Sequence, residues 1–300
     1  MSSPPPSSPC RPEPAMMANR PDELPPRSQR IFAWFRWYCR RYYFPAHFHA
    51  LRLLPPTQCL AGDHSDPDPA MPLVILANHP SWWDPVVCTL LSARFPTRVI
   101  YSPIDARALE TYRFFRKLGF FGVEQGTARG AARFLQCSRA VLDTPGTILW
   151  ITAQGRFTDP RSRPVTLMPG LARVLARWRK PAMVLPLAIE YPFWDERSPE
   201  ALAHFGEPLQ VDPSRPISAE AWGGLLAGRL EQTMDNLALA GISRDPGIFH
   251  TLHTGRAGVG GMYDRIRRAS AWLGLRRFDG THAAAIAVRK TKEIGDGGYP

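Results

Sequence analysis

The sequence predicts an α/β domain with a largely parallel sheet flanked by helices. Short, fully apolar runs of the kind that form buried strands alternate with longer amphipathic segments along the middle of the chain. Such alternation is typical of strand–helix–strand units, whose strands lie parallel and are covered by helices. The 300 residues, 44% of them hydrophobic, are enough for one sizeable core. We therefore expect one main domain with appendages.

The expected strands and helices follow from this alternation. We expect strands over 73–77, 98–101, 120–123, 147–152 and 183–190, and helices over 85–95, 105–118, 128–143, 170–178 and 218–240. The first of these helices is expected to begin with Asp84 as N-cap and Pro85 at the first helical position. Pro186 lies inside the last strand and cannot donate to a ladder, which predicts a bulge or a sheet edge.

Composition divides the chain into five segments. Residues 1–29 are rich in Pro and Ser and are expected to be disordered, and they lack the apolar core of a signal peptide, which predicts no export. Residues 54–70 are a polar, Pro-rich linker, and 71–245 are the main domain. Residues 246–300, a C-terminal extension with a basic stretch from Arg265 to Arg277, are expected to be partly disordered.

Residues 30–53 are expected to form amphipathic helices that dock on a membrane surface. On a helical wheel one face carries five apolar or aromatic side chains, Ile31, Trp34, Phe35, Tyr38 and Tyr42. Arg36 and Arg40 fall on the opposite face. This composition is typical of an interfacial helix, and the segment is too short and too charged to span a bilayer. The alternative is an amphipathic helix packed on the protein's own core.

The net charge of +11 implies an anionic partner. Nucleic acid, an anionic membrane surface and an acidic cofactor or carrier are all candidates. The sequence has no phosphate-binding loop, zinc-finger spacing or strongly basic block, so nucleic acid ranks below a membrane surface. The five cysteines are scattered and never form a Cys-x-x-Cys pair, which indicates free thiols in a reducing compartment. No set of residues predicts a metal site.

A histidine and an aspartate stand in the turn that follows the strand over 73–77. His79 and Asp84 are five residues apart and could not meet on a regular helix, but the Pro80-Ser81 turn can fold the carboxylate back onto the imidazole. A carboxylate on one ring nitrogen leaves the other free to take a proton, as a general base does. The alternative is that Asp84 only caps the helix and His79 is a solvated turn residue.

The stretch Asn78-His79-Pro80-Ser81-Trp82-Trp83-Asp84 resembles the His-x4-Asp motif of the glycerolipid acyltransferase family, the lysophosphatidic-acid-acyltransferase type. Three later stretches resemble further blocks of that family in the same order. They are Gly119–Gly126, Ala153–Thr158 and Met183–Glu190. Two blocks depart from the family pattern, because Gln125 and Phe157 stand where arginines are expected, and Gln154 replaces a glutamate.

The resemblance implies that a fatty acyl group passes from an acyl-CoA or acyl-carrier-protein thioester to a lipid hydroxyl, at the cytoplasmic side of a membrane, with peripheral attachment and no further cofactor. His79 would be the general base, oriented by Asp84. The residues assigned to substrate binding are Asn78, Ser81, Gln125, Gln154, Gly155 and Arg156.

The missing arginines predict an acceptor that is a neutral or glycosylated lipid rather than a phosphate monoester, since bidentate arginines are the natural partners of phosphate. The alternative acceptor is lysophosphatidic acid, with Arg156, Arg161 or Arg163 on its phosphate. Two other classes of protein stay open, a non-catalytic lipid-binding protein and, from charge alone, a nucleic-acid-binding module.

Overall fold

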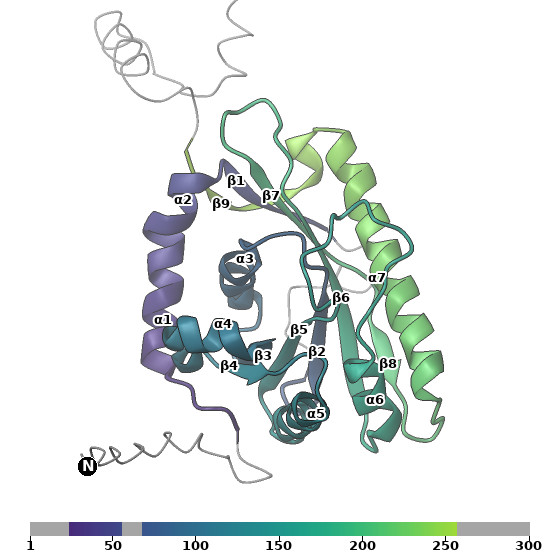
Figure 1. The fold of residues 1–300 in the computed structure, drawn as a ribbon. Helices are drawn as coiled ribbons and strands as arrows, with labels where there is room; N and C mark the ends of the chain where they lie inside the picture. The colour runs from purple at the N-terminus through teal and green to yellow at the C-terminus, as the bar shows by residue number, and fades with distance from the viewer. Residues whose placement is uncertain (1–23, 56–67, 257–300) are drawn as a thin grey trace, which may run out of the picture.

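A computed structural model describes residues 24–55 and 68–256. It contains a mixed, mostly parallel sheet of nine strands, flanked by helices (Figure 1). The predicted fold class is confirmed. The strands are β1 (Ala50–Leu54), β2 (Leu73–Ala77), β3 (Val99–Asp105), β4 (Phe120–Val123), β5 (Thr147–Thr152), β6 (Ala182–Glu190), β7 (Glu200–Phe205), β8 (Leu209–Val211) and β9 (His250–Thr254).

The order of the strands places β2 near the middle of the sheet. The order is β4-β3-β5-β2-β6-β7-β1-β9, and β8 pairs with β6 beside this path. Strands β2 to β6 are parallel to their neighbours within this set, whereas β7 and β8 run antiparallel to β6. All five residues of β2 are buried. A strand buried on both faces needs apolar residues at every position, which is why it appears in the sequence as a continuous apolar run.

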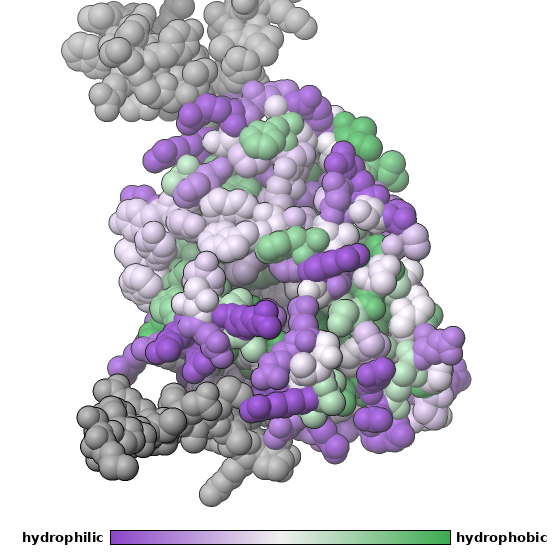
Figure 2. Space-filling view, in the orientation of Figure 1, coloured by the Kyte–Doolittle hydropathy of each residue, from purple (hydrophilic) through white to green (hydrophobic). Residues whose placement is uncertain are grey.

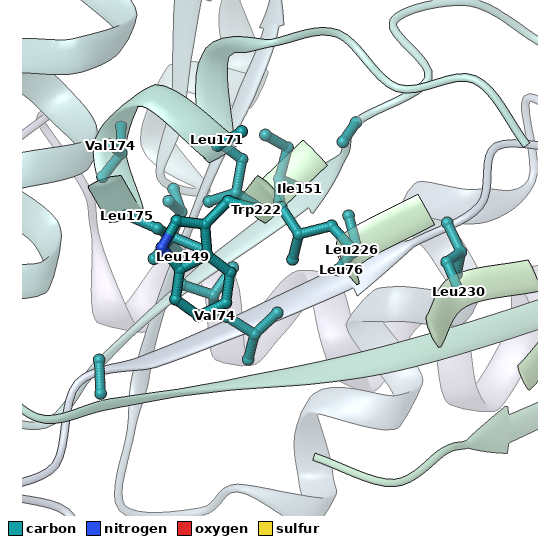
Figure 3. Packing of buried hydrophobic residues seen from close by; sticks show 14 of the residues in the cluster. Val74, Leu76, Leu149, Ile151, Leu171, Val174, Leu175, Trp222, Leu226 and Leu230 are labelled. Carbon is teal, nitrogen blue, oxygen red and sulfur yellow. The ribbon is translucent and has the colours of Figure 1, made fainter. Parts of the chain in front are cut away.

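The helices lie on both faces of the sheet. They are α1 (Gln29–Tyr38), α2 (Phe44–His47), α3 (Asp84–Leu91), α4 (Ala106–Thr111), α5 (Ala128–Asp143), α6 (Gly170–Arg177) and α7 (Ala219–Ile242), with a π-helix, η1 (Cys39–Tyr43), and the 3₁₀ turns η2 (Ser92–Arg94), η3 (Arg113–Lys117) and η4 (Pro246–Ile248). Alternate residues of β2 face two separate cores. Val74 and Leu76 pack with α6 and α7 (Figure 3), whereas Ile75 faces the core shared with α3.

The N-terminal segment corrects one prediction. The helices expected over 30–53 end at His47, and residues 50–54 form strand β1, which pairs with β7 and β9. Arg52 of β1 lies beside Glu200 of β7, and Nε of Arg52 donates to the Glu200 carboxylate at 3.0 Å. The strand therefore depends on a partner 148 residues away in the chain, which local sequence patterns do not reveal.

One side of the N-terminal helices packs inward and the other carries exposed aromatic rings. Cys39 and Phe44 are fully buried, whereas Trp34, Trp37 and Tyr42 are each about half exposed. The N-terminal helices lie at the left of the molecule in Figure 1, where the surface in Figure 2 is mostly pale. Within 24–55 and 68–256, no helix is both long and apolar enough to cross a membrane.

Two further expectations are wrong in detail. The helix expected over 105–118 is broken at Tyr112 into α4 and the 3₁₀ turn η3. Strand β6 is not an edge strand, because β2 lies on one side of it and β7 and β8 on the other. Pro186 is tolerated because it stands where β6 changes partner, after β8 pairs with Ala182–Val184 and before β7 pairs from Leu187. A missing N–H costs little at that gap.

The domain extends beyond its predicted limits at both ends. Arg27 forms an isolated bridge with Leu118, and the Ser28 hydroxyl caps α1, so residues just before 30 already contact the domain. At the other end β9 joins the sheet beside β1, although the sequence places it in the C-terminal extension. Most of the predicted tail, of the linker and of the C-terminal extension, with its basic stretch, lies outside the described residues.

Candidate active site

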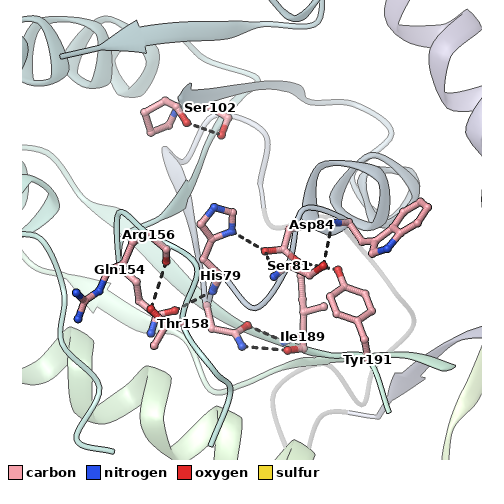
Figure 4. Close-up of polar contacts among 12 residues, drawn as sticks. His79, Ser81, Asp84, Ser102, Gln154, Arg156, Thr158, Ile189 and Tyr191 are labelled. Atoms are coloured by element: carbon pink, nitrogen blue, oxygen red, sulfur yellow. Dashed lines mark hydrogen bonds and ion pairs between the residues drawn. The ribbon is translucent and has the colours of Figure 1, made fainter. Parts of the chain in front are cut away.

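The turns that follow β2, β5 and β6 meet at one edge of the sheet (Figure 4). Because parallel strands end at the same edge, segments far apart in the sequence come together there. His79 follows β2, Gln154 and Thr158 follow β5, and Tyr191 follows β6. The site is therefore built by the most buried part of the sheet.

His79 and Asp84 are in direct contact, as the sequence predicts. The Nδ1 atom of His79 lies 2.6 Å from Oδ2 of Asp84. A carboxylate only accepts hydrogen bonds, so Nδ1 carries the proton and donates it, which leaves a lone pair on Nε2. The side chain of His79 is 21% exposed and that of Asp84 is 2% exposed. The pair can therefore take up a proton at a nitrogen that substrate can reach.

Asp84 is not the N-cap that the sequence suggests. It is the first residue of α3, and no side chain caps that helix. Its carboxylate bonds backwards instead, to His79 and to the backbone N–H of Ser81 at 3.3 Å. The preceding turn, rather than the helix, therefore determines where this carboxylate lies.

Tyr191 extends the His79–Asp84 pair to three side chains, and the sequence alone does not predict its part in the site. Its hydroxyl donates to Oδ1 of Asp84 at 2.7 Å. Burial, followed by the negative charge of Asp84, raises the pKa of Tyr191 well above its usual value, so the hydroxyl keeps its proton. The same two causes raise the pKa of the Cys88 thiol well above its usual value. Cys88 thus stays a protonated thiol and is a poor nucleophile.

Asn78 fastens the start of the turn to β6. Its side-chain Nδ2 donates to the carbonyl of Ile189 at 3.0 Å, and its Oδ1 accepts from the N–H of Ile189 at 2.8 Å. Asn78 is 1% exposed. The side chain continues the β2–β6 ladder one step beyond the last strand residue, and this contact holds His79 at the edge of the sheet.

The loop after β5 is hydrogen-bonded to both backbone groups of His79, its N–H and its carbonyl. Oε1 of Gln154 accepts from the N–H of His79 at 2.8 Å, and the N–H of Thr158 donates to the carbonyl of His79 at 2.9 Å. Gln125 holds the same loop from β4, since its Nε2 donates to the carbonyl of Gly155 at 2.9 Å. The two glutamines that replace charged residues of the family pattern are thus engaged in supporting the site.

Gly155 and Phe157 shape the space around the imidazole. Gly155 has a φ of +70°, and a Cβ there would lie 2.8 Å from Cγ of Met168. That conformation and that contact favour glycine. The ring of Phe157 lies 4.5 Å from the ring of His79, centroid to centroid, and is 57% exposed. An apolar surface therefore adjoins the candidate base.

The arginines near the site are directed elsewhere. The guanidinium of Arg156 extends away from His79 in Figure 4. Arg161 donates to both carboxylate oxygens of Asp159, at 2.9 and 2.7 Å, and Arg163 is paired with Asp235 on α7.

The hydroxyl oxygen of Ser81 accepts a hydrogen bond from the N–H of Trp83 at 3.3 Å. Within the described ranges no three His, Cys, Asp or Glu side chains cluster closely enough to hold a metal ion.

The structure brings most of the predicted site residues together. His79 and Asp84 form a hydrogen-bonded pair, and the side chains of Asn78, Gln125 and Gln154 bond the backbone around it. Their assignment to substrate binding stays a prediction, as does that of Ser81, Gly155 and Arg156. Tyr191 could have been suspected from its place, because it comes directly after a strand whose carboxyl end was expected beside His79.

Comparison with known proteins agrees with this geometry. Residues 59–190 match the protein-family model described as Acyltransferase. The matched range contains all four sequence blocks on which the resemblance rests, and the predicted family is confirmed. A search among curated proteins finds no sequence that matches the chain.

The role of Asn78 is testable by substitution. Asn78→Ala leaves the N–H and the carbonyl of Ile189 buried without partners, and we expect the free energy of unfolding to fall by about 1–3 kcal/mol. Urea denaturation followed by circular dichroism measures this change. Asn236→Ala is the matched control, because Asn236 is exposed on α7 and its loss should change stability by less than about 0.5 kcal/mol. Equal stability of the two variants would contradict the assignment.

Proposed function

Because the chain carries an acyltransferase-family domain, we propose that it transfers a fatty acyl group from a thioester donor to the hydroxyl of a lipid. The observation that carries this proposal is the contact between His79 Nδ1 and Asp84 Oδ2, with Asp84 buried and Nε2 left free. The donor is an acyl-CoA or an acyl-carrier-protein thioester, and the enzyme uses no further cofactor.

The reaction proceeds by direct attack. Nε2 of His79 takes the proton of the acceptor hydroxyl, and the oxygen attacks the thioester carbonyl. Asp84 stabilises the imidazolium that forms, helped by the Tyr191 hydroxyl on its other oxygen. The tetrahedral intermediate collapses, the C–S bond breaks, and the leaving thiolate takes the proton from the imidazolium. No acyl-enzyme is required, in keeping with the protonated state of Cys88.

The acceptor is a neutral or glycosylated lipid. A phosphate monoester needs cations at the site, but Gln125 and Phe157 occupy the two positions where the family pattern has arginine. Phe157 places an apolar ring beside the base, which suits a lipid body or the face of a sugar ring. Arg161 and Arg163 already bond carboxylates. The alternative acceptor is lysophosphatidic acid, for which exposed Arg156 would turn toward the phosphate.

The enzyme attaches peripherally to the cytoplasmic side of a membrane through α1 and η1. Trp34, Trp37 and Tyr42 are exposed there, and Arg36, Arg40 and Arg41 belong to the same helical segment. Aromatic rings at the headgroup level and arginines near anionic lipids both favour binding, the latter by about 1 kcal/mol each. The aromatic cluster continues inward, since Tyr43 contacts Trp83 of the His-x4-Asp turn.

A non-catalytic lipid-binding protein is the second candidate, favoured by the loss of charged residues from the second and third blocks. The complete His79–Asp84–Tyr191 arrangement favours the enzyme, because lipid binding alone would not need a positioned imidazole. Consumption of an acyl thioester by the purified protein distinguishes the two candidates.

The catalytic prediction concerns the base. His79→Ala should lower acyl transfer by about 10²–10⁴-fold, the range expected for loss of a positioned general base. Asp84→Asn should also lower it strongly, since an amide does not stabilise the imidazolium. Thioester consumption is measured alongside the circular-dichroism spectrum. His250→Ala is a matched control, because His250 is exposed on β9. Near-normal turnover in a folded His79→Ala variant would refute the mechanism.

The membrane prediction uses exposed rings, because a deletion reaching Phe44 would remove part of the core. Trp34→Ser combined with Trp37→Ser should release most of the protein from sedimented vesicles of mixed neutral and anionic lipid. The control is Phe193→Ser, since Phe193 is 67% exposed but lies between β6 and β7. If both variants cosediment like the parent protein, α1 is not the attachment site.

The acceptor prediction is tested by competition. With one acyl thioester and equal amounts of a glycosylated diacylglycerol-type lipid bearing free hydroxyls, monoacylglycerol and lysophosphatidic acid, we expect the uncharged acceptors to be acylated preferentially. Preferred acylation of lysophosphatidic acid that is lost in Arg156→Ala would establish the alternative acceptor. Arg107→Ala serves as control, because Arg107 is exposed on α4 and outside the loop after β5.

A further inference from the structure

A groove lined by basic side chains lies between α5 and α6, outside the site described above. It encloses about 300 Å³. Its floor is apolar and is formed by Leu135 of α5 and by Val174 and Trp178 at α6. Hydrophilic side chains gather over these two helices in the lower part of Figure 2. The groove thus has an apolar floor, and polar side chains form its sides.

Cations outnumber anions among the side chains that line the groove. Arg139, Arg173, Arg177, Arg179 and Lys180 line the groove with a single carboxylate, Asp143. That carboxylate is occupied by Lys180 at 2.6 Å and by Arg139 at 3.5 Å. Even so, the side chains of Arg139 and Lys180 are 79% and 61% exposed. Their charges remain available to a partner.

Arg173 and Arg177 are the cations best placed to meet a partner. They are four residues apart and therefore lie on the same face of α6, and both are exposed. Folding of the domain gives no reason for such a row, because like charges at this spacing are unfavourable in a helix. A surface that concentrates positive charge in this way recognises an anionic partner.

The chemistry of the groove favours a protein over a membrane or a nucleic acid. Among the described residues, no exposed large hydrophobic side chain lies on α5 or α6, so neither helix offers a ring to insert into lipid or to stack on a base. The two helices also cover the sheet face opposite α1 (Figure 1), where membrane contact is proposed. An apolar floor between cationic sides suits an amphipathic helix whose apolar face is bordered by acidic residues.

We propose that the α5–α6 groove docks an acidic, amphipathic helix of the protein that carries the acyl thioester. This inference rests on the proposed acyl transfer and selects a carrier protein as the donor. The groove runs along α5 away from the site, because α5 begins three residues after Gln125, which bonds the loop at the site, and ends at Asp143 before β5 starts. By the rise of an α-helix, Leu135 and Asp143 lie about 10 Å and about 22 Å along α5 from its first residue. The flexible thioester arm of the carrier would have to span this distance.

The test compares two donors with one charge reversal. The variant is Arg173→Glu with Arg177→Glu, and its matched control is Arg197→Glu with Arg215→Glu, two exposed arginines outside the groove. Donors are palmitoyl-acyl-carrier protein and palmitoyl-CoA. We expect kcat/KM with the carrier thioester to fall about tenfold or more in the groove variant, and to fall steeply with salt in the parent protein. With palmitoyl-CoA the groove variant should stay within about twofold of the parent protein.

A second measurement keeps the docking surface testable without turnover. Fluorescence anisotropy of labelled carrier protein reports binding directly, so failure of the proposed function would appear as no thioester consumption while carrier binding is still lost in the groove variant. Carrier binding that is equal in both variants would overturn the inference, as would equal losses with both donors. Binding of anionic vesicles or a DNA duplex, lost only in the groove variant, would assign the groove to those partners and overturn it too.

Discussion

The carboxylate of Asp84 is the group on which the site depends. A charge that is 2% exposed is costly unless it is paired, and this one has three donors, from His79, Tyr191 and the backbone of Ser81. The donors come from β2's turn and from the segment after β6, so the carboxylate is satisfied only when both strands are in place. It also sits at the N-terminus of α3, where the helix dipole favours negative charge. The fold and the orientation of His79 thus both require that the Asp84 carboxylate meets its donors.

The elements that could be predicted from sequence are those with local signals. Strands β2, β5 and β6 are buried on both faces and appear as continuous apolar runs, while α5 and α6 carry one apolar stripe each. The contact between His79 and Asp84 was predictable as well, because both residues lie in one short turn. In each case the determining residues are neighbours in the chain.

The elements that were missed depend on distant partners. Strand β1 contains Arg52, which is buried only because Glu200 pairs with it, and β9 has the polar sequence His-Thr-Leu-His-Thr. Tyr191 reaches Asp84 across 107 residues, and Gln154 reaches the backbone of His79 across 75. Composition and periodicity describe a residue's neighbours in sequence, so contacts of this kind emerge only when the strand order is known.

The position of β1 has a consequence for how the chain assembles during synthesis. The strand precedes both of its partners, β7 and β9, which are completed only about 150 and 200 residues later. Until then β1 stays unpaired on the growing chain, and an unpaired strand is prone to aggregation. Under the proposed membrane attachment, early binding of the α1 rings to a lipid surface would keep β1 apart from other chains while its partners are still being made.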